Sequence, residues 1–536
     1  MRISHPPRAL VNARLFLGRD AIPAAVGFRD GRILALGSET KVREALGPRA
    51  QVFDAGGGVV CPGFIDSHLH LGSLGENLTA VDLAQCSSIA RLKIQVAERA
   101  RTLSEGVWIT GRGWDQDRME ERRYPTAADL DDAAPGIPVF LRRACGHAAV
   151  ASSPALRAAG IGNYEEDPPG GRFERYDDGR ITGVLHETAL ARVLSAIPKP
   201  DRATRRDHLR RAIEKCHSVG ITSVQSNESG QDLDDLYEMF EQMFAEPRRR
   251  LRTYLDLGPE HLTSIEQRGL TTGDGNEFLR LSALKLFADG SLGARTALLS
   301  RDYADDPGNR GTEVIPEEQM REYVNRARGL GMQVAVHAIG DAALDNTLRL
   351  LDGSGEAGKA DRIIHCQISR PEQFGAMARA GVIACIQPRF VATDMAWAEA
   401  RVGREILSTS YAWRSMLDAG VDLAGGSDAP VEPPDPLLGI HAAVNRVDDA
   451  GEPAEGWFAA EKLAPREALH LFGPGAAKSE GAEEWKGALE PGFVADFVLL
   501  DSDPLEVNPS RIAQIEVLET WVGGVRVYGD SSISGD

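Results

Sequence analysis

Short apolar runs alternate with amphipathic stretches through the middle of the chain. Eight runs have the length and composition of buried strands, at 63–67, 221–225, 251–256, 281–287, 333–337, 362–366, 382–386 and 421–425. Helical periodicity fills most of the intervals between them, as at 202–218, 317–330, 342–352 and 370–380. Because repeated strand–helix units form parallel sheets, the pattern predicts an α/β protein with a (β/α)8 TIM barrel.

The two ends of the chain have a different pattern. Short strands separated by Gly, Asp and Pro turns are predicted at 9–16, 24–28, 32–36, 52–54, 495–500 and 520–527. Since chain termini often lie close together, we expect both ends to build one small composite β-sandwich domain. The expected domains are therefore residues 1–62 with 476–536 for the β-sandwich and residues 63–475 for a distorted barrel.

The barrel segment is longer than a plain TIM barrel, which has about 250 residues. The excess falls after the first predicted strand, mainly at 72–200, and this stretch includes a Gly/Pro-rich piece at 168–171. We expect residues 72–200 to form an inserted subdomain over the barrel mouth.

Composition excludes some partners. The chain has 60 Lys and Arg against 79 Asp and Glu, a net charge of −19, and no long basic block, so neither nucleic acid nor an anionic membrane is expected as a partner. No apolar run approaches the roughly 18 residues of a spanning helix, and no signal peptide is indicated. Six scattered Cys without a Cys-x-x-Cys pair favour free thiols in a reducing cytoplasm. A homodimer is expected only because two-fold dimers are the commonest oligomers.

Two His follow the first predicted barrel strand, which is where TIM barrels place their active sites. The strand ends Asp66-Ser67-His68-Leu69-His70, and side chains alternate along an extended segment, so His68 and His70 point to the same side. Two imidazoles on one side can grip a metal ion. A His-x-His motif is common by chance, however, and is not sufficient evidence of a metal site.

Four more residues occupy comparable positions on later strands. Lys285 lies in the fourth strand, where a buried amine is costly unless it is paired or modified. His337 and His365 end the fifth and sixth strands, and Asp428 follows the eighth. Each alone is consistent with a hydrogen-bonded core residue or with a snorkelling lysine. Their joint position at strand ends favours one shared metal site.

These motifs resemble a known family. The segment Pro62-Gly63-Phe64-Ile65-Asp66-Ser67-His68-Leu69-His70 resembles the opening motif of the amidohydrolase superfamily, and the six residues above are similar to its binuclear metal pattern. The segments 111–116, 289–293, 426–431 and 492–496 resemble the branch that contains the N-substituted formamide deformylases.

The resemblance implies two divalent metal ions, with the ligands His68, His70 and Asp428 for one, His337 and His365 for the other, and Lys285 between them. Lys285 would be carboxylated by CO2. The ligands suit Zn²⁺, and Fe, Mn, Co and Ni stay open. A hydroxide bridging the metals would attack a polarised carbonyl, with Asp428 as general base and then general acid. The expected activity is hydrolysis of a non-peptide C–N bond (amide, N-formyl or N-acyl) in a small molecule.

Other functions on the same barrel are left open by the sequence. A mononuclear deaminase of an aminated heterocycle would share the His-x-His motif and the final Asp, but it uses a Glu soon after the fifth-strand His. Here His337 is followed by Ala338-Ile339-Gly340-Asp341. Ester, lactone and phosphotriester hydrolysis also stay open. A noncatalytic assembly module would be expected to have lost some of the six residues.

Five residues are candidates for substrate contact. Trp114 and Asp115 could line a pocket or be a packed Trp beside a turn Asp. His147 and Glu187 resemble branch motifs or are structural, although the sequence Val150-Ala151-Ser152-Ser153 departs from the Trp-x-Asn-Ser expected after His147. Arg389 could pair with a substrate carboxylate or be a solvated surface residue.

Overall fold

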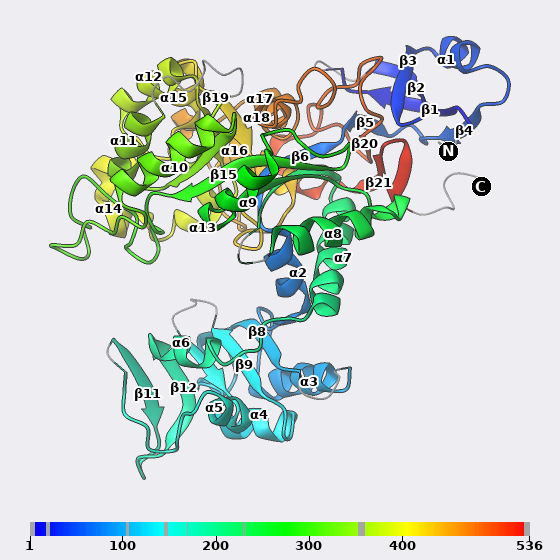
Figure 1. Cartoon of the computed structure of the whole chain (residues 1–536). Helices are drawn as coiled ribbons and strands as arrows, with labels where there is room; N and C mark the ends of the chain where they lie inside the picture. Colours follow the sequence, from blue (N-terminus) through cyan, green and yellow to red (C-terminus); the bar gives the residue numbers. More distant parts are fainter. Residues whose placement is uncertain are drawn as a thin grey trace. The chain divides into compact units, whose positions relative to one another are not determined.

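The computed structural model describes residues 6–17, 22–102, 107–143, 148–168, 170–228, 230, 232–351 and 360–529. The chain divides into two compact units (Figure 1). The first, called the barrel unit here, combines Met1–Ser73 with Leu209–Asp536, and the second, called the inserted unit, is Leu74–His208.

The barrel unit contains a sheet of eight parallel strands in the order β6, β13, β14, β15, β16, β17, β18 and β19. Their bounds are Phe64–Leu69, Ile221–Glu228, Arg252–Leu257, Leu279–Phe287, Gln333–Ala338, Arg362–His365, Ile383–Ile386 and Asp422–Gly425. All eight predicted barrel strands are confirmed. Their chain order equals their order in the sheet, as expected for successive βα units.

The two edge strands of this sheet meet at their C-terminal ends. The backbone N–H of Asp428 donates to the carbonyl of His68 (2.8 Å), and that of His70 donates to the carbonyl of Ala429 (2.9 Å). A Cβ on Gly426 would lie only 2.7 Å from the backbone nitrogen of His68, so only glycine allows this approach. The junction nearly closes the barrel and brings Asp428 to the two His of the first strand.

Helices follow most of the barrel strands (Figure 1). Their bounds are Arg202–Ser218 (α7), Leu233–Phe244 (α8), Leu262–Arg268 (α9), Glu317–Gly329 (α10), Asp341–Leu350 (α11), Pro371–Ala380 (α12), Phe390–Asp394 (α13), Ala398–Leu407 (α14), Trp413–Asp418 (α15), Pro436–Asn445 (α16), Pro465–Leu471 (α17) and Pro474–Ser479 (α18). Helix α12 shows why such segments are predictable, because Pro371 opens it and Gly381, with φ of 65°, ends it. The four predicted helices of this region are confirmed.

Both ends of the chain form a second sheet of the barrel unit, drawn in blue and red in Figure 1. Its order is β22, β21, β20, β5, β1, β2 and β3, and β4 also pairs with β1. The bounds are Arg8–Leu15 (β1), Ile22–Arg29 (β2), Arg32–Gly37 (β3), Gln51–Asp54 (β4), Val59–Pro62 (β5), Phe497–Leu500 (β20), Val517–Val522 (β21) and Val525–Tyr528 (β22). Helix α1, Glu39–Leu46, follows β3. Strands from both ends of the chain therefore pair in one sheet, as predicted, and the bounds of a separate β-sandwich domain stay a prediction.

Two details of the composite sheet differ from the prediction. Residues 520–527 form parts of two strands, because Gly523 and Gly524 adopt positive φ (58° and 72°) and turn the chain between β21 and β22. Strand β5 was not predicted, yet it carries the connection between the two ends. It pairs with β1 on one side and with β20 on the other.

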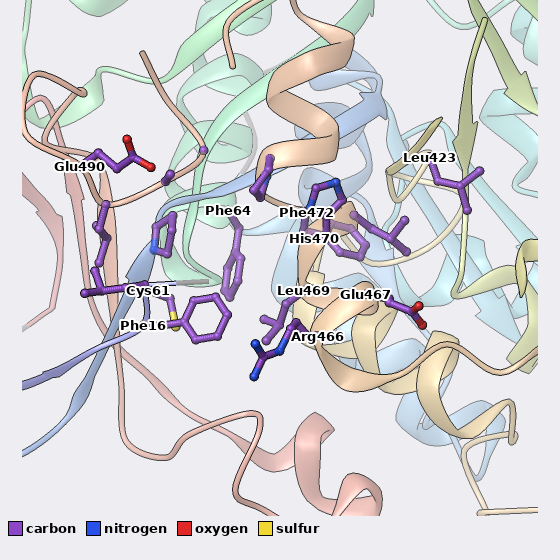
Figure 2. A pocket seen from close by; sticks show the side chains of 18 of the residues that line it. Phe16, Cys61, Phe64, Leu423, Arg466, Glu467, Leu469, His470, Phe472 and Glu490 are labelled. Atoms are coloured by element: carbon purple, nitrogen blue, oxygen red, sulfur yellow. The ribbon is translucent and has the colours of Figure 1, made fainter. Parts of the chain in front are cut away.

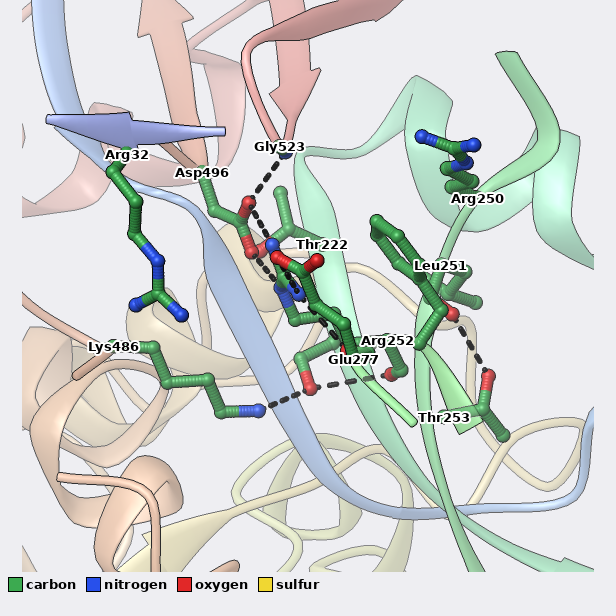
Figure 3. Close-up of polar contacts among 12 residues, drawn as sticks. Arg32, Thr222, Arg250, Leu251, Arg252, Thr253, Glu277, Lys486, Asp496 and Gly523 are labelled. Carbon is green, nitrogen blue, oxygen red and sulfur yellow. Dashed lines mark hydrogen bonds and ion pairs between the residues drawn. The ribbon is translucent and has the colours of Figure 1, made fainter. Parts of the chain in front are cut away.

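A buried ion pair ties the composite sheet to the barrel (Figure 3). Arg252, the first residue of β14, donates from Nε and Nη2 to the carboxylate of Asp496 (2.6 and 3.0 Å). The same carboxylate accepts the backbone N–H of Gly523 at 2.7 Å. Lys486 donates to the hydroxyl of Ser223 at 2.6 Å and also pairs with Glu480. These groups compensate one another, which buried charges require.

Another buried ion pair, between Asp256 and Arg362, lies inside the barrel. The two residues belong to β14 and β17, which are not neighbours in the sheet, and both side chains are fully buried. Arg362 also donates to the hydroxyl of Ser282 at 3.2 Å. The pair therefore links separated strands through the barrel interior.

We expect Asp256→Ala to lower the free energy of unfolding by about 3–5 kcal/mol, because it leaves the guanidinium of Arg362 buried without its partner. Urea unfolding followed by circular dichroism measures the effect. The matched control is the double variant Asp256→Leu/Arg362→Met, which removes both charges and should recover most of the loss. A single variant as stable as the wild type would contradict this account of the pair.

The inserted unit has its own six-stranded sheet in the order β11, β12, β10, β9, β8 and β7. The strands are Val81–Asp82 (β7), Ile109–Trp114 (β8), Val139–Arg143 (β9), Ala148–Ala151 (β10), Gly171–Arg175 (β11) and Ile181–Glu187 (β12), with helices Ile89–Ala100 (α3), Ala127–Ala133 (α4), Ser153–Ala158 (α5) and Ala189–Leu194 (α6). Alternate residues of β9 enter separate apolar clusters, Leu141 in one and Phe140 in the other, so both faces of the sheet are covered. The expected position of this insertion over the barrel mouth stays a prediction.

Helix length and cysteine state complete the description. Within the described ranges, no helix is long and apolar enough to cross a membrane. The described cysteines, Cys61, Cys86, Cys216, Cys366 and Cys385, are buried free thiols.

Candidate metal centre

His68, His70 and Asp428 meet where the first and last barrel strands join. Asp428 Oδ1 lies 3.2 Å from Nε2 of His70 and 3.4 Å from Nε2 of His68. One potential ligand atom from each residue lies within 4.8 Å of the others. Two imidazoles and a carboxylate at this spacing suit a divalent transition metal such as Zn²⁺.

The other three predicted ligands extend the same cluster across the barrel mouth. The imidazole of His365 lies between those of His68 and His337, with ring centroids 5.8 and 4.5 Å away. Lys285 Nζ lies 3.3 Å from Nε2 of His68. The structure thus brings together all six residues that the sequence analysis proposed as metal ligands.

Hydrogen bonds at the outer nitrogens orient two of the imidazoles. His365 donates from Nδ1 to Oε1 of Gln387 (2.6 Å), which leaves Nε2 as its free nitrogen. His337 donates from Nε2 to the carbonyl of Gly290 (3.1 Å), with Oδ1 of Asp289 at 3.5 Å, which leaves Nδ1 free. Such outer hydrogen bonds select the tautomer that a metal ligand needs.

Buried carboxylates hold the backbone around the cluster. Asp289 accepts the backbone N–H groups of Ile339 and Gly340, just after His337. Asp66 accepts the backbone N–H groups of His68 and Ser427, next to Asp428. Burial raises the pKa of Asp66 and of Asp289 to about 7. Both carboxylates therefore fix the chain segments that carry the proposed ligands.

Burial also sets the charge state of the cluster. It lowers the pKa of His337 to about 3 and the pKa of His68 and of His365 well below the ordinary value, so these imidazoles are neutral at pH 7, as metal ligands must be. Burial lowers the pKa of Lys285, whose exposed fraction is 1 %, to about 8.

The surroundings of Lys285 fit a metal centre with a modified lysine. Within the described residues no carboxylate lies at ion-pair distance from its Nζ, which hydrogen-bonds to Nε2 of His68, although the charges of Asp428 and Asp256 act on it from farther away. A buried ammonium without an anionic partner is costly. Carboxylation would replace this cation with a carbamate anion among neutral imidazoles. Divalent ions would then balance the negative charges of the carbamate and of Asp428. The donor set therefore fits two divalent ions and a carbamate.

Trp114 and Asp115 are engaged inside the inserted unit. Trp114 is fully buried, and its Nε1 donates to the carbonyl of Leu141 at 2.9 Å. Asp115 pairs with Arg143 at 2.8 Å and accepts the backbone N–H of Asp117 at 3.1 Å. These contacts match a packed Trp beside a turn Asp, and a role of either residue in substrate binding stays a prediction.

Glu187 and His147 also belong to the inserted unit. Glu187 is exposed at the end of β12 and adopts a positive φ of 53°. His147 lies outside the described residues. Substrate contact by these two residues stays a prediction as well.

Arg389 differs from the solvated surface arginine that the sequence analysis offered as its alternative. It is 9 % exposed and forms ion pairs with Glu432, at 3.4 Å, and with Asp449. With His441 and Lys462 it lines a cavity of about 360 Å³. A substrate carboxylate would have to compete with these two acidic partners for the guanidinium.

Several supporting residues were not singled out from the sequence. Gln387 directly follows the seventh strand, and Ser226 and Glu228 end the second. The rule that barrel sites lie at strand ends could have drawn attention to them. Their hydrogen-bonding partners could not be read from the sequence, because those partners lie on other elements. Gln387 bonds to His365 at the end of β17, and Ser226 and Glu228 bond to the helix that begins at Leu71.

A cavity of about 930 Å³ lies elsewhere in the barrel unit (Figure 2). Its lining includes Phe64 and Leu423, near the beginnings of β6 and β19, together with Phe16 and Leu489 from the terminal segments. It therefore opens at the N-terminal end of the barrel, opposite the cluster, and none of the six proposed ligands lines it. Its size alone does not make it the functional site.

Comparisons with known proteins agree with this geometry. Residues 51–528 match the sequence profile of the amidohydrolase family. The chain is 36% identical over 511 residues to the putative amidohydrolase YtcJ of Bacillus subtilis, covering 95% of this chain and 96% of the relative. It is 31% identical over 544 residues to the N-substituted formamide deformylase of Arthrobacter pascens, covering 96% and 97%. The crystal structure of an uncharacterized metal-dependent hydrolase from Pyrococcus furiosus is similar with a TM-score of 0.76 and 33% identity, over 93% of this chain and 100% of that one.

Proposed function

We propose that this chain, which belongs to the amidohydrolase family, cleaves a non-peptide C–N bond of a small molecule. It has the fold of the metal-dependent hydrolases of that superfamily. The scissile bond would be an amide, N-formyl or N-acyl bond. The observation that carries the proposal is the cluster of four imidazoles, one buried lysine and one aspartate at the C-terminal end of the barrel. Similarity to the formamide deformylase of Arthrobacter pascens supports this bond type.

Two divalent ions, preferably Zn²⁺, would supply an acidified water and a Lewis-acid contact to the substrate carbonyl when bound here. His68, His70 and Asp428 would hold one ion, His337 and His365 the other, and carboxylated Lys285 would bridge them. The neutral amine of Lys285 would react with CO2, forming an N–C bond and releasing one proton. Because burial lowers the pKa of Lys285 to about 8, more of the amine is neutral near pH 7 than for an exposed lysine.

Asp428 is the group that would move the proton during hydrolysis. Its carboxylate faces the same space as the imidazoles of His68 and His70 and is only slightly exposed. It would accept a proton from the attacking water and then deliver it to the leaving nitrogen as the C–N bond breaks. The products are a carboxylic acid, formic acid in the case of an N-formyl substrate, and an amine.

The contacts of Asp341 weigh against a deaminase. This acidic residue follows soon after His337, where a deaminase would need a free carboxylate as proton shuttle. Its Oδ1 accepts the backbone N–H of Ser300 at 2.9 Å, its Oδ2 accepts the hydroxyl of Ser300, and Arg370 pairs with it. A carboxylate committed to these donors does not supply the shuttle.

We expect the purified protein to contain divalent metal and to hydrolyse members of a panel of N-formyl amines and small amides. Removing the metal with a chelator should abolish hydrolysis, and Zn²⁺ with bicarbonate should restore it, because the nucleophile and the carbamate both depend on them. Metal analysis by mass spectrometry and amine release measure the two effects. Turnover that is unaffected by complete metal removal would contradict the proposal. Ammonia release from aminated heterocycles would instead indicate a deaminase, and turnover confined to esters and lactones would indicate an ester or lactone hydrolase.

A further inference from the structure

The second barrel strand, β13, ends in a buried carboxylate beside the first metal-ligand motif. Glu228 is the last residue of β13 and is 5 % exposed. Strand β13 pairs in parallel with β6, and Ser226 lies opposite Leu69, the residue before His70. The end of β13 therefore lies next to the point where the chain leaves His70.

Ser226 and Glu228, together called the β13 anchor here, hold the two residues that follow His70. The hydroxyl of Ser226 accepts the backbone N–H of Leu71 at 3.0 Å and donates to Oε1 of Glu228 at 2.7 Å. Oε1 of Glu228 also accepts the backbone N–H of Gly72 at 3.1 Å. The anchor is thus a short chain of hydrogen bonds that ends on one carboxylate oxygen.

Gly72 leaves room for this carboxylate. A Cβ at position 72 would lie 2.9 Å from Oε2 of Glu228, closer than real contacts allow. Leu71 and Gly72 begin helix α2, Leu71–Thr79, and the first N–H groups of a helix have no partner within the helix itself. Glu228, on β13, supplies a hydrogen-bond acceptor to the first turn of helix α2. Burial raises the pKa of Glu228, so its charged form is costly.

The two His of the motif differ in how firmly packing holds them. The side chain of His68 is 1 % exposed, whereas that of His70 is 26 % exposed. Packing alone therefore restrains His70 less than it restrains His68. The hydrogen bonds of the β13 anchor hold the backbone immediately after His70.

We propose that Ser226 and Glu228 are positioning residues of the metal centre, which hold the backbone of Leu71 and Gly72 so that His70 faces Asp428. The inference rests on the metal site of the proposed function. It requires no contact of either side chain with the substrate. Its expected consequence is a loss of metal affinity when the anchor is broken, in addition to any change in activity.

Three variants separate the hydrogen bonds of the anchor from its charge. Ser226→Ala removes the acceptor for Leu71 and the donor to Glu228 with little change in volume. Glu228→Ala removes the acceptor for Gly72. Glu228→Gln keeps an oxygen acceptor of nearly the same shape but removes the negative charge.

The experiment titrates each metal-free protein with Co²⁺ against a competing chromophoric chelator and records the visible absorption bands of bound Co²⁺. We expect Ser226→Ala and Glu228→Ala to weaken Co²⁺ binding by about 10- to 100-fold and to shift the bands, and Glu228→Gln to stay within about threefold of the wild type. Circular dichroism of the metal-free proteins checks that each variant is folded. Ser226→Ala is the conservative variant if Glu228→Ala does not fold.

Ser223→Ala is the matched control. Ser223 lies on the same strand, and its hydroxyl bonds to the carbonyl of Arg252 at 3.2 Å and to Glu480 at 2.9 Å, near the other end of β13. This variant should leave Co²⁺ affinity unchanged. Wild-type affinity in both Ser226→Ala and Glu228→Ala would overturn the positioning role, and so would a loss in Glu228→Gln as large as that in Glu228→Ala. A wild-type protein that binds no Co²⁺ would overturn the proposed metal centre itself, together with this inference.

Discussion

Lys285→Ala should bind fewer metal ions than the wild type and should lose amide hydrolysis by on the order of 10³-fold. The lysine is buried among imidazoles with no carboxylate at ion-pair distance in the described part of the chain, and only its carboxylated form would bridge two ions. Alanine leaves this position empty. Metal content by mass spectrometry and kcat for the best amide substrate measure the two losses.

Lys486→Ala is the control for the loss of a buried lysine as such. Lys486 is also buried, and burial likewise lowers its pKa to about 8, but it pairs with Glu480 at the other end of the barrel unit. Its replacement should reduce stability and leave the metal content unchanged. Acetate or propionate supplied with Zn²⁺ should restore part of the activity of Lys285→Ala by occupying the bridging position. A Lys285→Ala protein with full metal content and wild-type kcat would contradict the bridging role.

Strand order and the proposed ligands could be predicted from sequence for the same physical reason. In a parallel barrel every strand ends at one face, so residues such as His337 and His365, which follow apolar runs, are brought together without any knowledge of the loops. Period-two alternation then aims His68 and His70 to the same side. Local patterns were sufficient to group the proposed ligands, because the ends of successive barrel strands all lie around the same opening of the barrel.

Other features depend on partners that no local pattern identifies. Arg389 follows a barrel strand, as a substrate-binding residue would, but Glu432 and Asp449 meet it only in the folded chain. Strand β5 is short, and its role follows from pairing with β1 and with β20 from the other end of the chain. Such contacts join residues far apart in sequence, so one sequence without its fold does not specify them.

The β13 anchor shows the same dependence inside the site. Ser226 and Glu228 have the spacing of one strand face, which the sequence displays, but the backbone groups that they bind belong to Leu71 and Gly72 at the start of helix α2. The requirement for glycine at position 426 is equally hidden in the sequence, because only the folded barrel shows that its backbone approaches that of His68 in β6. The sequence therefore indicates the proposed ligands more readily than the groups that orient them.

Asp428→Asn should lower kcat by about 10²- to 10⁴-fold while KM changes little, because the amide keeps an oxygen toward the metal position but cannot take up and deliver the proton. Steady-state kinetics with one amide substrate, together with metal analysis, measure this directly. Asp361→Asn is the matched control, since Asp361 is a buried carboxylate at the start of β17, where it accepts the backbone N–H of Val334 at 2.8 Å. That variant should keep wild-type kcat. An Asp428→Asn enzyme that retains its metal and a kcat within about twofold of the wild type would assign the proton transfer to another group, because removal of the general base should lower kcat by far more than twofold.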